Sequence, residues 1–200
     1  MRRLKPHPNP PRDLGTIDLP ISRRSRQWFR AHACNRDPLF FGRSREWRYD
    51  DPNRSFGVLY LSFDFEGAFI EGCVHDSGLG KTAPLLSENY LRRRCLSKIR
   101  FARPLKLVDL SGSGLAAIGA DARIFAGEYR IAQRWSRAIW RHPRQPDGIL
   151  YRSRHNPSLV CAAIFDRAPS ATSKKLGSFL GPDLIDRTAK LLDKYGVGLS

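Results

Sequence analysis

Residues 56–73 read FGVLYLSFDFEGAFIEGC and join a short apolar run to an amphipathic one. Positions 57–61 are apolar and rich in β-forming residues, which is typical of a short buried strand. Ser62, Asp64 and Glu66 then supply a helix N-cap and an acidic first turn. The apolar residues that follow recur with helical spacing, so we expect a helix with one face in the core and Glu71 on the flank of that face.

The remaining patterns predict an α+β fold, with a mixed β-sheet core and surrounding helices. Residues 28–33 alternate like a strand, which places Arg30 and His32 on one face. Residues 129–140 have the clearest helical spacing. Further strands are expected at 96–101, 105–110, 149–151 and 159–165. Short helices are expected at 86–93 and 115–118, and a closing helix at 182–194. Because strands and helices do not alternate regularly, a doubly wound parallel sheet is disfavoured.

The length of 200 residues fits one domain. Residues 1–22 are basic and proline-rich, so we expect a loosely ordered leader followed by a single catalytic domain over 23–200. No apolar run is long enough to span a bilayer, and the leader precedes no apolar segment of the kind found in signal peptides. We expect a cytoplasmic protein that does not contact membranes. The four cysteines are scattered without a C-x-x-C pair, so neither a disulfide framework nor a metal site is expected.

The charge is strongly positive, because 35 Lys and Arg residues face 19 Asp and Glu residues, giving a formal +16. Such a surface attracts anions, whether nucleic acid, nucleotide phosphates or an acidic protein. The basic residues are spread along the chain and do not form one tail. A basic nucleic-acid-binding module therefore stays open as an alternative function.

Two glycine-rich stretches partly match the motifs of phosphate-binding loops. Residues 78–82, GLGKT, end like a Walker A loop, but the first glycine of that motif would fall on His75. Gly112 and Gly114 follow an expected strand as in a dinucleotide-binding turn, but the helix after them is short. We interpret both stretches as connections and not as nucleotide sites.

Arginine, aromatic and carboxylate side chains instead suit the cleavage of an N-glycosidic bond that already carries a good leaving group. The transition state of that reaction resembles an oxocarbenium ion and chiefly needs a nearby carboxylate and a firmly held substrate. Nicotinamide in NAD is such a leaving group. Arginines would clamp the pyrophosphate of NAD, and aromatic rings would pack on the nicotinamide or its ribose.

Several sequence blocks occur in a fixed order between residues 26 and 167. They are Phe29-Arg30, Arg48-Tyr49-Asp50-Asp51-Pro52, the run from Phe56 to Tyr60, Ala68 and Glu71, Val108-Asp109-Leu110, Gln133-x-Trp135, and Asp147-Gly148-Ile149-x-Tyr151-x-Ser153-Arg154. Their order and spacing resemble the RES-domain family, which takes its name from an arginine, a glutamate and a serine. The resemblance implies an ADP-ribosyltransferase-like fold and the toxin half of a RES–Xre toxin–antitoxin pair. It also implies NAD as a substrate that is degraded by phosphorolysis or hydrolysis, with no tightly bound cofactor.

Carried over position by position, the resemblance implies catalytic roles for Glu71, Arg48 and Ser153. It implies NAD contacts for Arg30, Arg48, Tyr60, Ser153 and Tyr49. Inorganic phosphate or water would accept the ADP-ribose, and a protein acceptor, as in an ADP-ribosyltransferase toxin, stays open as an alternative. The implied partner is an Xre-type antitoxin, through which nucleic acid would be contacted only indirectly. A homodimer within that complex is left open.

Overall fold

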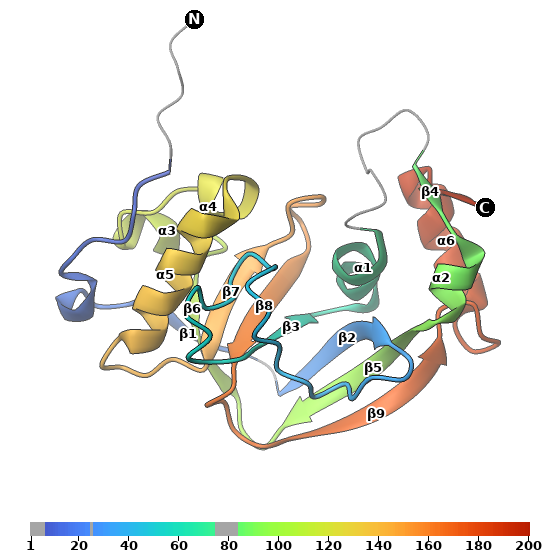
Figure 1. Ribbon diagram of the computed structural model, residues 1–200, viewed down its shortest axis with the longest axis horizontal. Coiled ribbons are helices and arrows are strands. Elements are labelled where there is room, and N and C mark those ends of the chain that lie inside the picture. The colour runs from blue at the N-terminus through green and yellow to red at the C-terminus, as the bar shows by residue number, and fades with distance from the viewer. Residues whose placement is uncertain (1–6, 25, 75–83) are drawn as a thin grey trace, which may run out of the picture.

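The computed structural model describes residues 7–24, 26–74 and 84–200. In these residues the larger strands are β1 (Ile21–Arg24), β2 (Gln27–Ala33), β3 (Val58–Ser62), β5 (Arg94–Phe101), β6 (Leu105–Asp109), β7 (Gly148–Arg152), β8 (Val160–Phe165) and β9 (Ala171–Ser178). They form one eight-stranded sheet in the order β1-β6-β7-β8-β3-β2-β5-β9, with β6 and β7 parallel and the other neighbours antiparallel. A mixed sheet with packed helices confirms the expected α+β fold (Figure 1).

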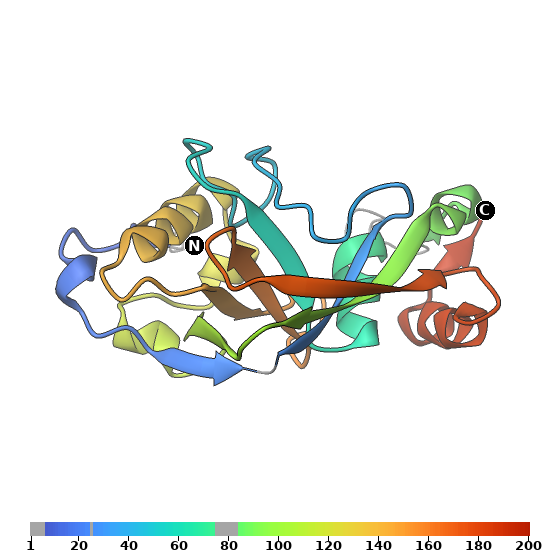
Figure 2. The ribbon, with the colours of Figure 1, turned by 90° about the horizontal axis from the view of Figure 1, so that it is seen from below.

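The helices lie in two groups along this sheet. The longer ones are α5 (Tyr129–Arg141) and α6 (Ile185–Tyr195), and Figure 2 shows them at opposite ends of the molecule. The short ones are the 3-10 turn η1 (Leu14–Thr16), α1 (Phe65–Phe69), the π-helix η2 (Ile70–Val74), α2 (Glu88–Arg92), α3 (Gly114–Ala117) and α4 (Arg123–Ala126). A separate two-stranded parallel sheet pairs β4 (Leu85–Leu86) with β10 (Gly198–Leu199). Within the described residues, no helix is long and apolar enough to cross a membrane.

A fork in the main sheet creates the space for a site. β2 pairs with β5 along its whole length, but it pairs with β3 at Phe29 and Ser62. Since the two strands are antiparallel, residues 30–33 of β2 and 58–61 of β3 lie on the same side of this pair, where they face each other across an opening. The connection between them, residues 34–57, crosses the opening and rejoins β3 through a bridge between Gly42 and Val58.

The predicted strand-to-helix unit is confirmed, with one change at its junction. The structure places Ser62 inside β3, and the N-cap of α1 is Asp64, whose side chain accepts a hydrogen bond from the Gly67 amide at 2.7 Å. Ser62 is therefore wrong as the cap, because the strand extends through it. At Ile70 the helix widens into the π-helix η2, which we also call the π-turn. The apolar face of α1 and η2 packs with α6 and with strands β2, β5 and β9.

The leader departs from the expected loose order over its described part. Leu14 and Leu19 are buried in the cluster that α5 forms with β6, β7 and β8, and burial of each leucine contributes about 1.5–3 kcal/mol. The Trp135 indole on α5 donates a hydrogen bond to the Pro8 carbonyl at 2.9 Å. The described part of the leader therefore packs into the cluster beneath α5, and its last two residues, Ile21 and Ser22, already belong to β1, which pairs with β6.

The structure contains a disulfide that the cysteine spacing did not predict. Cys34 and Cys95 are joined, with their Cα atoms 4.9 Å apart, while Cys73 and Cys161 are buried free thiols. The absence of any disulfide was therefore the wrong expectation. The 61-residue separation gives no sequence signal, whereas the pairing of β2 with β5 brings the two residues together.

Candidate functional site

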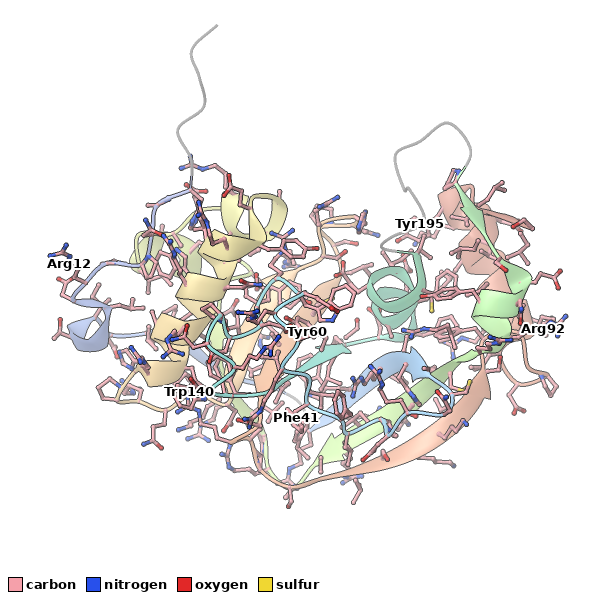
Figure 3. The ribbon with its side chains drawn as sticks, in the orientation of Figure 1. Arg12, Phe41, Tyr60, Arg92, Trp140 and Tyr195 are labelled. Atoms are coloured by element: carbon pink, nitrogen blue, oxygen red, sulfur yellow. A yellow bond between two sulfur atoms is a disulfide. The ribbon has the colours of Figure 1, made fainter. Side chains whose placement is uncertain are left out.

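A cavity of about 220 Å³ opens at the fork between β2 and β3. Its walls come from β2, β3, the helical unit α1–η2, the crossing connection and the start of β5. Four predicted site residues line it: Arg30, Arg48, Tyr60 and Glu71. In Figure 3 the labelled Tyr60 lies in the middle of the molecule, between the two groups of helices. The structure thus gathers residues that are up to 41 positions apart in the chain.

Glu71 is held by the predicted serine. It lies in the π-turn η2, and its Oε1 accepts a hydrogen bond from the Ser153 hydroxyl at 2.5 Å. Ser153 is 1% exposed, and its Oγ also accepts weaker hydrogen bonds from the amides of His155 (3.2 Å) and Asn156 (3.3 Å). Ser153 does not line the cavity. Its hydroxyl proton is used to orient the Glu71 carboxylate, whereas the sequence suggested a direct bond to substrate.

Arg30 lies on the β2 side of the fork and is anchored by the crossing connection. Its Nη1 donates to the carbonyls of Pro38 (2.6 Å) and Phe40 (3.1 Å). Burial, followed by the nearby charges of Arg36 and Arg94, lowers the pKa of Arg30 to about 10. At neutral pH the guanidinium remains charged, so this wall of the cavity carries a concentrated positive potential.

Arg48 faces the cavity from the other side and is more deeply buried. Its Nη1 donates to the carbonyls of Gly127 (2.8 Å) and Ile124 (3.3 Å), which lie at the end of α4. Its guanidinium carbon lies 4.4 Å from the centre of the Tyr129 ring, which also lines the cavity. Arg48 therefore joins the α4–α5 junction to the site, with part of its guanidinium committed to backbone carbonyls.

The two predicted tyrosines differ in position. Tyr60 lines the cavity, and its hydroxyl accepts a bond from the Tyr49 amide (2.9 Å) and donates to Asp50 (3.0 Å). Loss of hydration, with the neighbouring Asp50, raises the pKa of Tyr60 well above its usual value, so its hydroxyl keeps its proton. Tyr49 is fully buried, packs on the ring of Tyr151 at 4.8 Å and does not line the cavity. Its side chain supports the wall from behind.

Sequence reasoning missed two arginines of the cavity lining, Arg36 and Arg94. Arg94 opens β5, and its Nη2 donates to the Gly72 carbonyl at 2.6 Å, which ties β5 to the π-turn. Its Nε is buried and makes no hydrogen bond within the described residues. Arg94 belongs to a run of three arginines, and only the pairing of β5 with β2 distinguishes it from its two neighbours.

Aromatic rings complete the lining. Phe29, Trp47, Tyr129 and Tyr151 all contribute, and Trp47 remains 43% exposed at the rim. Tyr151 could have been selected from the sequence, because it lies two residues before Ser153 in one of the quoted blocks. The lining therefore combines four arginines, one carboxylate and several rings.

His32 lies on the same strand face as Arg30, as expected, and lines the cavity, but it is structural. Its ring nitrogens lie 2.8 Å from the Ala33 carbonyl and 2.8 Å from the Ser97 hydroxyl. Burial lowers the pKa of His32, so the ring is neutral at pH 7. Among the described residues, no group of three His, Cys, Asp or Glu side chains could hold a metal ion.

Close packing at Gly72 sets the position of Glu71. A β-carbon on Gly72 would lie 2.5 Å from the β-carbon of Ala31 on β2, which is closer than such atoms approach in proteins. Only glycine therefore allows the π-turn to lie directly against the strand that carries Arg30. The approach brings the carboxylate and the arginine side of the cavity together.

The chain is similar in sequence and in fold to known proteins. A probable toxin of Sinorhizobium fredii (strain NBRC 101917 / NGR234), y4kH, is 36% identical over 104 residues, which are 50% of this chain and 79% of that protein. A chain from the crystal structure of the M. tuberculosis MbcT–MbcA toxin–antitoxin complex has the same fold, with a TM-score of 0.61 and 17% identity over 88% of this chain and 91% of that one. The RES domain model matches residues 27–180, which include every cavity residue named above, and the chain therefore belongs to the RES domain family.

Proposed function

We propose that the protein is the toxin of a toxin–antitoxin pair and that it cleaves the bond between nicotinamide and ribose in NAD. The observation that carries this proposal is the cavity itself, where the Glu71 carboxylate faces a lining of four arginines and several aromatic rings. Nucleotide pyrophosphates are bound by arginine guanidiniums, and flat heterocycles pack on aromatic side chains. The similarity to a probable toxin supports the toxin role.

Substrate binding would follow the two sides of the fork. Arg30, Arg36 and Arg94 lie on or near β2 and would meet the pyrophosphate, and the buried Nε of Arg94 would supply a donor. The cavity volume of about 220 Å³ is below the roughly 300–1,000 Å³ typical of sites that enclose a whole ligand. The nicotinamide–ribose end would therefore enter the cavity, while the adenosine end would lie over its rim.

Glu71 would act at the bond that breaks. As the bond between the ribose carbon and the nicotinamide nitrogen lengthens, its electron pair leaves with nicotinamide and positive charge develops on the ribose. A carboxylate held at a fixed distance stabilises that charge without reorganising, which lowers the barrier. An oxygen of phosphate or water would then bond to the ribose carbon, and where water is the acceptor the proton that it loses would pass to the solvent. Ser153 supplies the fixed orientation of Glu71.

An antitoxin partner is part of the same proposal. The chain of similar fold was crystallised within the MbcT–MbcA toxin–antitoxin complex, which supports a protein partner for this chain as well. Such a partner would neutralise the toxin by occupying or closing the cavity. Co-expression with the product of a neighbouring gene, followed by the NAD assay on the purified complex, would test this part.

The central experiment measures NAD and its products after incubation with the purified, partner-free protein. We expect nicotinamide release, with ADP-ribose formed in water and its 1″-phosphate formed when inorganic phosphate is added. Glu71→Gln should abolish turnover, whereas Glu88→Gln, at an exposed glutamate that begins α2 and does not line the cavity, should retain it. Intact NAD after long incubation with wild-type protein would refute the proposal. Label transferred to a macromolecule, with little free ADP-ribose, would instead indicate a protein ADP-ribosyltransferase.

A further inference from the structure

A second hollow of about 330 Å³ lies on the outer side of α5, between that helix and η1. Of the described residues that line it, four are arginines and none is an aspartate or glutamate; the arginines are Arg12, Arg134, Arg137 and Arg141. It shares no lining residue with the cavity at the fork. In Figure 3 the labelled Arg12 lies at the outer edge of the molecule, far from the central Tyr60. We call this hollow the α5 groove.

The arginines of α5 form one continuous row. They occupy positions 130, 134, 137 and 141, and this spacing of 4, 3 and 4 residues keeps them on one face of the helix. With a rise of 1.5 Å per residue, the row is about 16 Å long. The opposite face carries the buried residues, including Trp135 and Ile139. Arg134 and Arg141 are exposed on the row and Arg137 is partly buried, while Arg130 lies beyond the groove lining and 3.9 Å from Glu128.

The charges of the groove are only partly neutralised by the protein itself. Arg137 forms an ion pair with the buried Asp51 at 2.7 Å, and Arg134 bonds to the Asn9 side chain at 2.9 Å. Arg12 and Arg141 are exposed and form no ion pair with any residue that the structure describes. Positive charge at Arg12, Arg134 and Arg141 is therefore not balanced by a carboxylate among the described residues, and a multivalent anion would relieve their mutual repulsion.

We propose that the α5 groove binds the phosphate backbone of double-stranded nucleic acid without sequence preference. A 16 Å row spans the rise of about five nucleotides in one strand, so its guanidiniums can meet several phosphates along that stretch. Guanidiniums at this spacing position a duplex through its backbone and do not read bases. The formal charge of +16 provides the long-range attraction.

The composition of the groove favours a duplex over the other polyanions. The large apolar side chains exposed in the described residues are Phe40, Trp47, Phe63, Leu85, Tyr90, Ile185 and Leu199, and none of them lines the groove. A protein partner normally inserts or meets such apolar anchors. Single-stranded nucleic acid requires exposed aromatic rings on which bases stack, and the groove lining has none, since its His142 is buried.

The test measures binding of a labelled 20-base-pair DNA duplex by fluorescence anisotropy between 50 and 200 mM salt. The groove variant replaces Arg12, Arg134 and Arg141 with glutamine and leaves Arg137, which neutralises Asp51, unchanged. The control variant replaces three exposed arginines elsewhere, Arg26, Arg93 and Arg100, which removes the same charge. Circular dichroism and NAD turnover on both variants establish that the fold and the cavity are intact.

The groove variant should bind on the order of 10- to 100-fold more weakly at 100 mM salt, with the salt slope less steep by about 2.7, or about 0.9 per lost phosphate contact. The control variant should keep the wild-type slope. Equal losses in both variants would overturn the proposal in favour of a diffuse electrostatic attraction, and so would absence of DNA binding by the wild type. Stronger competition by poly-glutamate than by unlabelled duplex would overturn it in favour of an acidic protein partner. Because none of these residues lines the cavity, an enzyme inactive on NAD would leave the binding result readable.

Discussion

Replacement of Ser153 by alanine should slow NAD cleavage by about 10- to 100-fold without changing KM appreciably. The Ser153 hydroxyl donates to Glu71 at 2.5 Å and does not line the cavity, so the change removes an orienting contact and no substrate contact. A hydrogen bond to a charged group contributes about 1.5–3 kcal/mol. If most of that free energy stabilises the transition state, its loss lowers kcat by about 10- to 100-fold, because about 1.4 kcal/mol corresponds to a factor of ten in rate.

The assay is a double-mutant cycle with Glu71→Gln, following nicotinamide release and the products together. If Ser153 acts through Glu71, its removal should cost almost nothing once the carboxylate is already gone. Ser158→Ala is the matched control, because Ser158 is exposed in the same loop and bonds to Asn156 at 2.6 Å, not to Glu71. Independent, multiplicative losses from the two changes would refute the reasoning, and so would a rise in KM with unchanged kcat, which would place Ser153 on the substrate.

Three other properties follow from the packing and charge of the described residues. Gly72→Ala should destabilise the protein by about 1–3 kcal/mol in urea unfolding and lower kcat, because the new β-carbon overpacks against β2 and displaces the π-turn. Although burial opposes it, the hydrogen bonds led by Arg137 hold the pKa of Asp51 below its usual 3.8. Stability from this pair is therefore present above about pH 4 and lost as the pH falls through the lowered pKa, so Asp51→Asn should flatten the acid limb of the stability curve. Reduction of the Cys34–Cys95 disulfide, which closes 61 residues, should lower stability by up to about 4 kcal/mol.

Each of these three predictions would be contradicted by one measured result. An alanine at position 72 that leaves both the unfolding midpoint and kcat unchanged would mean that the π-turn is not constrained by β2. Parallel acid limbs for wild type and the asparagine variant would remove Asp51 from the acid response. Identical urea midpoints with and without reductant, in protein whose free thiols have been counted, would show that the disulfide contributes no stability.

The strand-to-helix unit and α5 could be predicted from the sequence because their apolar spacing is regular. The strand β9 could not, since its sequence ATSKKLGS lies at the edge of the sheet and is largely exposed, so it shows no alternation. The strand β1 is similar, with the sequence ISRR at the opposite edge. Backbone pairing with a neighbouring strand, and not side-chain burial, defines both elements.

The site residues could be predicted only where the family resemblance assigned a role to an individual position. Arg30, Arg48, Tyr60 and Glu71 meet in one cavity, while the bond between Ser153 and Glu71 joins positions 82 residues apart and has no local signal. Arg36 and Arg94 were missed for the same reason, because surface arginines and cavity arginines look alike until strand pairing is known. Tyr49 is buried behind the cavity wall. The sequence could not show this, because a tyrosine suits a buried core as well as a ligand contact.

The lowered pKa of Arg30 also bears on how the empty protein behaves. Burial, and then repulsion from Arg36 and Arg94, make a proton on Arg30 easier to lose, which means that these like charges destabilise one another when the cavity holds no anion. The residues that would attract the pyrophosphate of the proposed substrate therefore repel one another in the free protein. Binding of an anion would relieve this repulsion. We therefore expect neutral substitutions of these arginines to stabilise the free protein and, at the same time, to weaken ligand binding.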